Sequence, residues 1–460
     1  MLFDERHDTW ATSNRFVPRT FVRPLYRFSQ IEAASGLALL VAAAVALIWA
    51  NSPLADSYHH LFEEVHLEIS LGAFHFEESL GHFINDGLMA LFFFVVGLEI
   101  KREMVLGDLS NPKAAALPVV AALGGMIVPA LIYLAFTSGA GGEATRGWGI
   151  PMATDIAFAV GVISLLGRRV PAGGKLFILA LAIADDIGAI AVIAVFYTTD
   201  LRALWLVGAV IGLGLIWFGQ RSGVRSLIFY VPFALFVWFA TLESGVHATL
   251  AGVVMGLLTP ARAWYSATEL DTKARMILDT YPIGKTILDE ERADHEAMLL
   301  AEIANESVAP LNRLEHRLLP WSSFVIVPLF ALANAGVTFS GTPLGGILEN
   351  PVALGVGLGL LVGKPIGITL FAWLAVRSGI GRLPPHTTWS HIVGLGSLAG
   401  IGFTVSLFVT GLAFTSDEFT GVAKIGIFAG SLLAGIVGST LLVRSRREPI
   451  PMPAPAEVPA

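Results

Sequence analysis

The chain has 460 residues, of which 55% are hydrophobic and only 14% are charged, and its formal net charge is -7. A soluble protein carries about 25% charged residues, so this composition predicts a polytopic membrane protein. No basic patch interleaved with aromatic residues suggests nucleic acid, and the absence of cysteine excludes disulfides, thiolate metal sites and thiol catalysis.

Twelve apolar segments follow one another along the chain, and each is a candidate transmembrane helix. They cover residues 31–50, 82–100, 114–137, 147–166, 175–198, 203–219, 225–241, 245–260, 320–340, 352–376, 388–413 and 421–443. The sequence therefore predicts an all-α membrane domain over residues 31–443. Residues 1–30 are expected to form a cytoplasmic arm, residues 261–319 a long and partly helical cytoplasmic loop, and residues 444–460 a disordered proline-rich tail.

The charges of the connecting loops orient these segments. With the N-terminus inside, nearly all lysine and arginine residues fall on inside loops, and the outside loops carry only Arg146 and Arg202, with Lys424 at a boundary. This asymmetry predicts an even number of spans with both termini in the cytoplasm. The outside loop 51–81 has alternating apolar residues around Gly72, which predicts a short β-hairpin.

Four charges lie deep inside apolar segments: Asp155, Asp185, Asp186 and Lys364. A single carboxylate at the membrane midplane costs a few kcal/mol, and two neighbouring ones also repel each other. The simplest interpretation is a structural ion pair, with Lys364 paired to Asp155 or to one of the two adjacent aspartates. Three carboxylates against one lysine nevertheless leave a surplus of negative charge, which favours a site for a cation or a proton.

Two of the spans are expected to be broken helices. Pro151 and the polar pair Thr154 and Asp155 interrupt the fourth span, and Gly394, Gly396, Gly400 and Gly402 occur in the eleventh. Each is the middle member of a trio of spans, and the two trios start on opposite sides of the membrane. Paired broken helices in inverted repeats are typical of a transporter with its binding site at the midplane. Asp155 is suited to balance the helix N-termini and Lys364 the C-termini. Alternatively, the glycines only permit close helix packing.

Further charges lie at the cytoplasmic ends of the spans. Glu99, Arg102 and Glu103 end the second span, and Glu315 and His316 precede the ninth. These residues are either ordinary charges at the membrane interface or a cytoplasmic entrance whose protonation opens and closes the transport path. His247 begins the eighth span, where a hydrogen-bonded packing role is favoured over a sensor.

Seven stretches of the chain resemble the NhaA family of sodium/proton antiporters. They are INDGLMALFFFVVGLEIKRE from Ile84, ATDIAFAVGV from Ala153, LAIADDIGAI from Leu181, SGVHATLAGV from Ser244, PLFALANAGV from Pro328, GKPIGI from Gly363 and GIGFTVSLF from Gly400. The resemblance implies a bacterial inner-membrane protein of twelve helices that exchanges sodium or lithium for protons, moves net charge and is activated at alkaline pH.

The resemblance also assigns roles to residues. It implies that Asp185 and Asp186 bind the sodium ion and the protons, that Lys364 is the partner of Asp185, and that Thr154 and Asp155 support the site at the helix crossing. It links Glu99, Arg102, Glu103, His247, Glu315 and His316 to the pH response. It further implies a homodimer joined through the hairpin around residues 65–77, and no cofactor besides the transported ions.

Two functions besides a secondary transporter would also account for some of these residues. An intramembrane aspartyl protease also uses two buried aspartates, but its chemistry needs a Gly-x-Gly-Asp context, whereas the aspartates here lie in MATD and IADD. A protease also leaves Lys364 and the inverted repeats unexplained, so the sequence predicts that the protein is not an enzyme. A channel would differ from an exchanger by ion flux without proton coupling.

Overall fold

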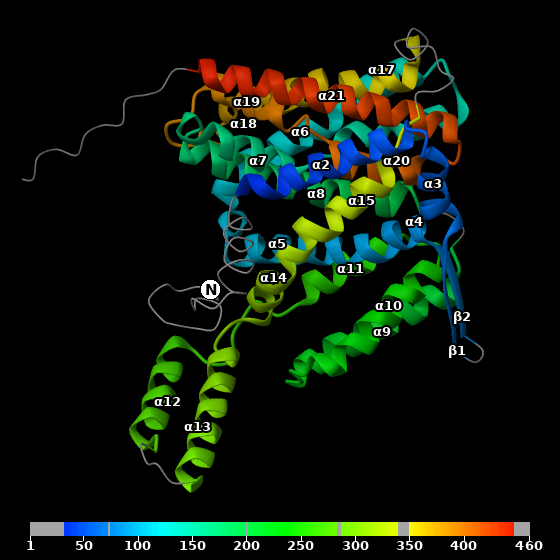
Figure 1. Cartoon of the computed structure of the whole chain (residues 1–460). Helices are drawn as coiled ribbons and strands as arrows, with labels where there is room; N and C mark the ends of the chain where they lie inside the picture. Colours follow the sequence, from blue (N-terminus) through cyan, green and yellow to red (C-terminus); the bar gives the residue numbers. More distant parts are fainter. Residues whose placement is uncertain (1–31, 72–73, 199–200, 283–286, 339–348, 446–460) are drawn as a thin grey trace, which may run out of the picture. The chain divides into compact units, whose positions relative to one another are not determined.

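The computed structural model describes residues 32–71, 74–198, 201–282, 287–338 and 349–445, and these residues are mostly helical (Figure 1). The chain divides into two compact units. Unit 1 comprises Met1–Leu37, Pro112–Ala189 and Val337–Ala460, and unit 2 comprises Ala38–Asn111 and Ile190–Gly336. The arm at residues 1–30 and all but two residues of the tail at 444–460 lie outside the described residues.

Unit 1 contains both trios of spans that the sequence predicts as inverted repeats. The first trio consists of α6 (Pro112–Thr137), a 3₁₀ helix (Gly142–Met152) followed by α7 (Ile156–Leu166), and most of α8 (Ala172–Phe196). The second consists of α17 (Pro351–Leu358), a π-helical turn (Gly359–Gly363), α18 (Lys364–Arg377), α19 (Trp389–Leu398), α20 (Phe403–Ala413) and α21 (Asp417–Arg444). Two segments separated in sequence by residues 190–336 therefore form one compact unit.

The two trios are held together by close packing of α6 against α18 (Figure 1). Gly124 of α6 and Gly367 of α18 face each other, and a Cβ atom added to either glycine would collide with the backbone carbonyl of the other. Small residues of this kind allow helix backbones to approach closely in a membrane protein. Glycine at these two positions therefore serves packing.

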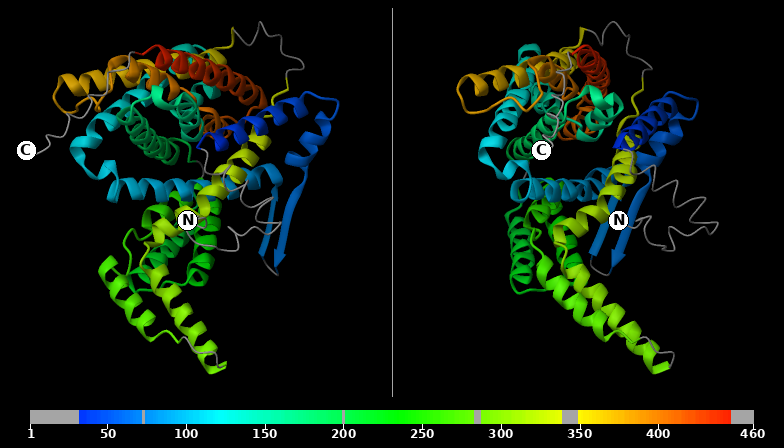
Figure 2. Two further views of the ribbon diagram at one scale, coloured as in Figure 1. Left: turned by 60° about the vertical axis from the view of Figure 1, so that its left-hand side comes forward. Right: turned by 90° about the vertical axis from the view of Figure 1, so that its left-hand side faces the viewer.

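Unit 2 begins in α2 (Glu32–Ala50), continues through α3 (Ala55–His59) and a π-helical turn (His60–Glu64), and then forms a β-hairpin. Its strands β1 (His66–Leu71) and β2 (Phe74–Ser79) are antiparallel, with His66 opposite Ser79 and Leu71 opposite Phe74 (Figure 2). The second predicted span follows as α4 (Leu80–Phe83), a π-helical turn (Ile84–Leu88) and α5 (Met89–Val105).

The remaining helices of unit 2 include a pair that the sequence places in a loop. They are α9 (Ala203–Arg221), α10 (Leu227–Glu243), α11 (Ala248–Leu258), α12 (Ala267–Thr280), α13 (Ile287–Glu306), α14 (Pro310–Trp321), a π-helical turn (Ser322–Ile326) and α15 (Val327–Asn334). α12 and α13 lie side by side (Figure 2), and Ser266 caps α12 through a capping box with Glu269. The long loop 261–319 is thus largely helical.

Tyr58 fixes the start of this unit to the end of α15. Its buried hydroxyl lies 2.8 Å from the carbonyl oxygens of both Leu332 and Ala333, and it accepts a hydrogen bond from the Gly336 amide at 3.2 Å. Burial raises the pKa of Tyr58 to about 12, so the hydroxyl remains a donor at physiological pH.

Eight helices of the described residues are long and apolar enough to cross a membrane, and α19 with α20 makes a ninth if this bent pair is one span. The chain is therefore a multi-pass membrane protein. The ninth predicted span differs from expectation, because the helical segment runs over Pro310–Asn334 and begins ten residues before residue 320. Its first turns are amphipathic, and Leu311 is buried although its sequence neighbours are polar or charged. These turns do not form a continuous apolar run, so the sequence does not predict them as part of the span.

Candidate functional site

Two broken helices cross in unit 1, as the sequence predicts. The chain is extended at residues 153–155 between the 3₁₀ helix and α7, and α19 and α20 meet at 50° around residues 399–402. The Asp155 amide donates to the Ile401 carbonyl at 2.7 Å, and the Thr154 hydroxyl donates to the Ala399 carbonyl at 2.9 Å. Each break thus satisfies backbone groups of the other, which a lipid environment requires.

Glycine makes this crossing possible. A Cβ atom added to Gly402 would lie 2.9 Å from Leu360 Cδ2 and 3.0 Å from the Ala153 carbonyl oxygen, which is closer than side-chain carbons normally approach. The glycines of the eleventh span therefore do contribute to close packing. They also permit the break, so the two interpretations of these glycines are compatible.

Asp155 lies between the N-termini of two half-helices. As the N-cap of α7, its Oδ1 accepts from the Phe158 amide at 3.0 Å. Its Oδ2 accepts from the amide of Thr404 at 3.2 Å and from the hydroxyl of the same residue at 2.6 Å, in the first turn of α20. A helix N-terminus carries about half a positive charge, so two of them balance one carboxylate. Asp155 is thus compensated without Lys364.

Lys364 pairs instead with Asp185. Its Nζ lies 2.7 Å from Asp185 Oδ2 and 2.9 Å from the Thr154 hydroxyl, and the side chains of Lys364 and Asp185 are 0% and 1% exposed. The Thr154 hydroxyl accepts a hydrogen bond from Lys364 and donates its own proton to the Ala399 carbonyl at the end of α19. The ammonium therefore also lies beside the C-terminal end of a half-helix, where positive charge is favoured.

The local sequence aims Lys364 at this position. The π-helical turn Gly359–Gly363 directly precedes it, and Pro365 follows it at the first turn of α18. A π-helical turn rotates the following residues relative to a regular α-helix, and such turns are frequent at functional sites. The side chain is thereby directed into the unit, where it is fully buried.

Asp186 brings a second carboxylate next to Asp185 on α8. Its side chain is buried with 8% exposure, and its charge interacts with that of Lys364. The single ammonium of Lys364 therefore interacts with the charges of two carboxylates. The second oxygen of Asp185, Oδ1, is buried and has no hydrogen-bond partner among the described residues. A buried carboxylate oxygen without a donor is costly, and a bound cation or proton would satisfy it.

Five of the six residues that the resemblance links to a pH response lie together in unit 2. Arg102 of α5 forms ion pairs with Glu103 and with Glu315 of α14, and Glu315 is 7% exposed. Glu99 interacts electrostatically with all three of these residues, and His316 interacts electrostatically with Glu315. His247 does not join these contacts. As the residue before α11, it makes a hydrogen bond from its Nε2 to the Tyr197 carbonyl at 2.9 Å, which fits the packing role.

One residue of the crossing, Thr404, was not predicted from the sequence. Thr404 supplies two of the donors to Asp155, yet it is one of two threonines in an apolar helix. Its position directly after the glycine-rich break, within GIGFTVSLF, was the available signal.

The sequence was compared with known proteins. Residues 26–442 match the family model described as Na+/H+ antiporter 1. An antiporter named Na(+)/H(+) antiporter NhaA from Koribacter versatilis is 45% identical over 92% of this chain and 92% of its own length. Another of the same name from Rhodopirellula baltica is 46% identical over 93% of this chain and 96% of its own.

A solved structure, that of the sodium proton antiporter MjNhaP1 from Methanocaldococcus jannaschii at pH 8, gives a TM-score of 0.44 at 15% identity, covering 91% of this chain and 96% of that one. This likeness is too weak to carry an argument. The family model and the relatives suffice, and their names are those of transporters, so the aspartyl protease gains no support from them. By these matches over nearly its whole length, the chain belongs to the NhaA family of sodium/proton antiporters.

Proposed function

We propose that this antiporter carries sodium, or lithium, and protons on the carboxylates of Asp185 and Asp186. The observation that carries the proposal is the buried Oδ1 of Asp185 without a hydrogen-bond partner among the described residues, next to a second buried carboxylate. Carboxylate oxygens are suitable ligands for a hard cation such as sodium. Lys364, Thr154 and Asp155 support the site by holding the crossing together.

Sodium and protons compete for these oxygens. A protonated carboxyl group has lost its charge and with it most of its strength as a cation ligand, while bound sodium favours the ionised form. Each ion therefore weakens the binding of the other to the same degree. Exchange follows if the site changes sides only when it is loaded with one or the other, and no separate proton path is needed.

The exchange is electrogenic in this proposal. Two carboxylates can release two protons, whereas they replace them with one monovalent cation, so a full cycle moves net charge across the membrane. The lysine stays in the site throughout the cycle and balances the charge of Asp185 whenever that carboxylate is ionised. A membrane potential would then drive transport as well as the ion gradients.

Regulation by pH is assigned to the group formed by Glu99, Arg102, Glu103, Glu315 and His316. This group contains three carboxylates, one guanidinium and one imidazole whose charges interact. Protonation of Glu99 or Glu315 changes the charge balance of the whole group, which is the basis of the proposed gate. His247 is proposed to act separately, through its hydrogen bond to Tyr197.

The proposed topology has twelve spans in a bacterial inner membrane, with both termini in the cytoplasm. The proposal is supported by the eight long helices, the bent pair α19 and α20, and three shorter apolar helices over Ala34–Ala50, Ile228–Glu243 and Ala248–Leu258, which overlap the apolar segments of the sequence. A homodimer is proposed to form through the β-hairpin, around residues 65–77, on the outer side.

Sodium titrations of transport current at several pH values test the competition. We expect the apparent affinity for sodium to fall as the pH falls, while high sodium restores the maximal current at moderately low pH. A maximal current that changes at constant apparent affinity would contradict competition and favour the separate gate. Flux of sodium without proton coupling in proteoliposomes would instead indicate a channel.

A further inference from the structure

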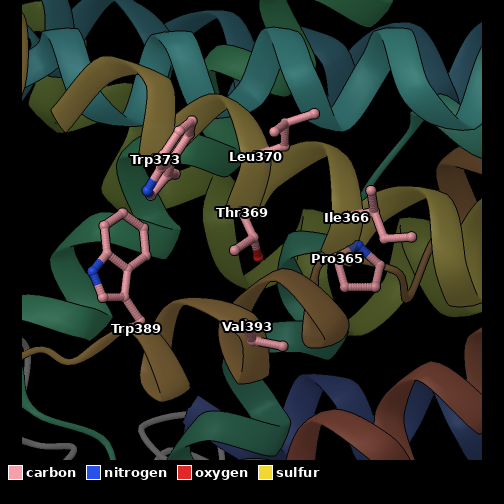
Figure 3. Close-up of a pocket in the computed structure, with 7 residues that line it drawn as sticks. All are labelled: Pro365, Ile366, Thr369, Leu370, Trp373, Trp389 and Val393. Atoms are coloured by element: carbon pink, nitrogen blue, oxygen red, sulfur yellow. The ribbon is translucent and has the colours of Figure 1, made fainter. Parts of the chain in front are cut away.

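An apolar groove of about 590 Å³ lies between α18 and α19, outside the ion site (Figure 3). Five residues of α18 between Pro365 and Trp373 line it, together with Trp389 and Val393 of α19. The two indole rings lie at one end of the groove, and Pro365 and Ile366 lie at the other. The groove thus has an aliphatic end and an aromatic end.

The groove opens on a surface that faces lipid. Ile366, Leu370 and Trp373 are 50%, 44% and 44% exposed, although α18 belongs to a segment long and apolar enough to span the membrane. From Pro365 to Trp373 a helix rises about 12 Å. Half the hydrocarbon thickness of a bilayer is about 15 Å, so the groove extends along most of one leaflet.

A positive charge lies at the aromatic end. The guanidinium of Arg377, at the end of α18, is 5.6 Å from the ring centroid of Trp373, and Arg382 follows in the connection to α19. Tryptophan is typical of the membrane–water interface, where its indole N–H can donate to polar groups of the lipid. Arginine binds phosphate oxygens through two donors at once.

We propose that this groove is a binding site for an anionic phospholipid. One acyl chain fills the aliphatic part along Ile366, Leu370 and Val393, and the phosphate lies with Arg377 beyond the two indole rings. Charge complementarity at one end and the leaflet-length apolar groove at the other select this ligand over a neutral lipid. The proposal does not depend on how ions are exchanged, because the residues that line the groove supply no ligand to the proposed ion site.

Native mass spectrometry of the detergent-purified protein can test the site with two lipids of identical acyl chains, phosphatidylglycerol and phosphatidylethanolamine. The variant Arg377→Gln removes the charge at the surface, and Val393→Trp fills the groove. Arg444→Gln, at the exposed end of α21, and Val437→Trp, on the exposed face of α21, make the same changes away from the groove.

We expect Arg377→Gln to weaken binding of phosphatidylglycerol about fivefold, which corresponds to the attraction of one arginine near an anionic membrane surface. Val393→Trp should reduce binding of both lipids, and the two α21 variants should bind like the unchanged protein. Equal binding of the two lipids, unaffected by Arg377→Gln, would overturn the anionic site. An equal loss for Arg444→Gln and Arg377→Gln would also overturn it, because it would indicate general attraction to basic residues.

Discussion

The ion pairs of the two units differ in their access to water. In unit 1, Lys364 and Asp185 are 0% and 1% exposed, whereas in unit 2 the side chains of Arg102 and Glu315 are 37% and 9% exposed. Water and salt screen the second pair but hardly the first. The charge balance of unit 1 must therefore be kept inside the protein, and in the proposed function this couples it to a bound ion. The pair in unit 2 reaches water through its arginine, which suits the proposed regulator.

The largest expected effect concerns Asp186. Asp186→Asn should abolish sodium-dependent proton flux in everted vesicles, because the site loses a cation ligand and a proton carrier. The protein should stay folded, with a melting temperature unchanged or higher, since two adjacent buried carboxylates no longer repel each other. The matched control is Asp271→Asn on α12, where the exposed carboxylate pairs with Arg275 one turn away. Flux near that of the unchanged protein would remove Asp186 from the proposed site.

The next effect is the energy of the buried pair. Lys364→Ala should destabilise the protein by about 3–5 kcal/mol, because it leaves the carboxylate of Asp185 buried without its counter-charge. In a background of Asp185→Asn the same change should cost much less. Unfolding measured for both single variants and the double variant gives the coupling free energy. Additive effects would show that the two residues contribute independently.

These two predictions rest on residues that the sequence could identify. Charges are rare in apolar spans, so Asp155, Asp185, Asp186 and Lys364 were visible as local exceptions. The two helix breaks were visible through a proline beside a polar pair and through four closely spaced glycines. The partner of Lys364 remained open on the residues alone, because Asp155 and Asp185 have the same chemistry. The structure separates them, since Asp155 is compensated by two helix N-termini.

Thr404 could not be identified in the same way. A threonine in an apolar helix usually bonds the carbonyl one turn before it, as Thr410 does with Ser406. The partner of Thr404 is 249 residues away and becomes a neighbour only when the two breaks cross. The beginning of the ninth span was missed for a different reason, because its first turns are polar on one face.

Thr404 gives the third prediction. Thr404→Val keeps the shape but removes the hydroxyl that donates to Asp155, so stability should fall by about 1.5–3 kcal/mol, as for a hydrogen bond to a charged group. Thr410→Val is the control on the same buried helix, because its hydroxyl bonds only its own helix. Thermal unfolding of the two variants compares them. Equal losses would mean that the crossing does not depend on the Thr404 hydroxyl.

The smallest effect on stability is expected in unit 2. Glu315→Gln breaks an ion pair whose arginine is 37% exposed, so screening should limit the loss to about 1 kcal/mol or less. Its effect on regulation should be larger. Glutamine resembles the protonated glutamic acid of low pH, and if that form is the inactive one, the variant should need a higher pH to reach half-maximal exchange.

The apparent sodium affinity at alkaline pH should not change in Glu315→Gln, because both aspartates of the ion site are intact. Glu306→Gln provides the control, since Glu306 lies 3.5 Å from Arg225 in another partly exposed ion pair of the same unit. Sodium titrations of current across pH measure the midpoint and the affinity together. If sodium affinity changes while the midpoint stays fixed, Glu315 acts on ion binding, and the division of labour between a sealed carrier site and a water-accessible regulator is wrong.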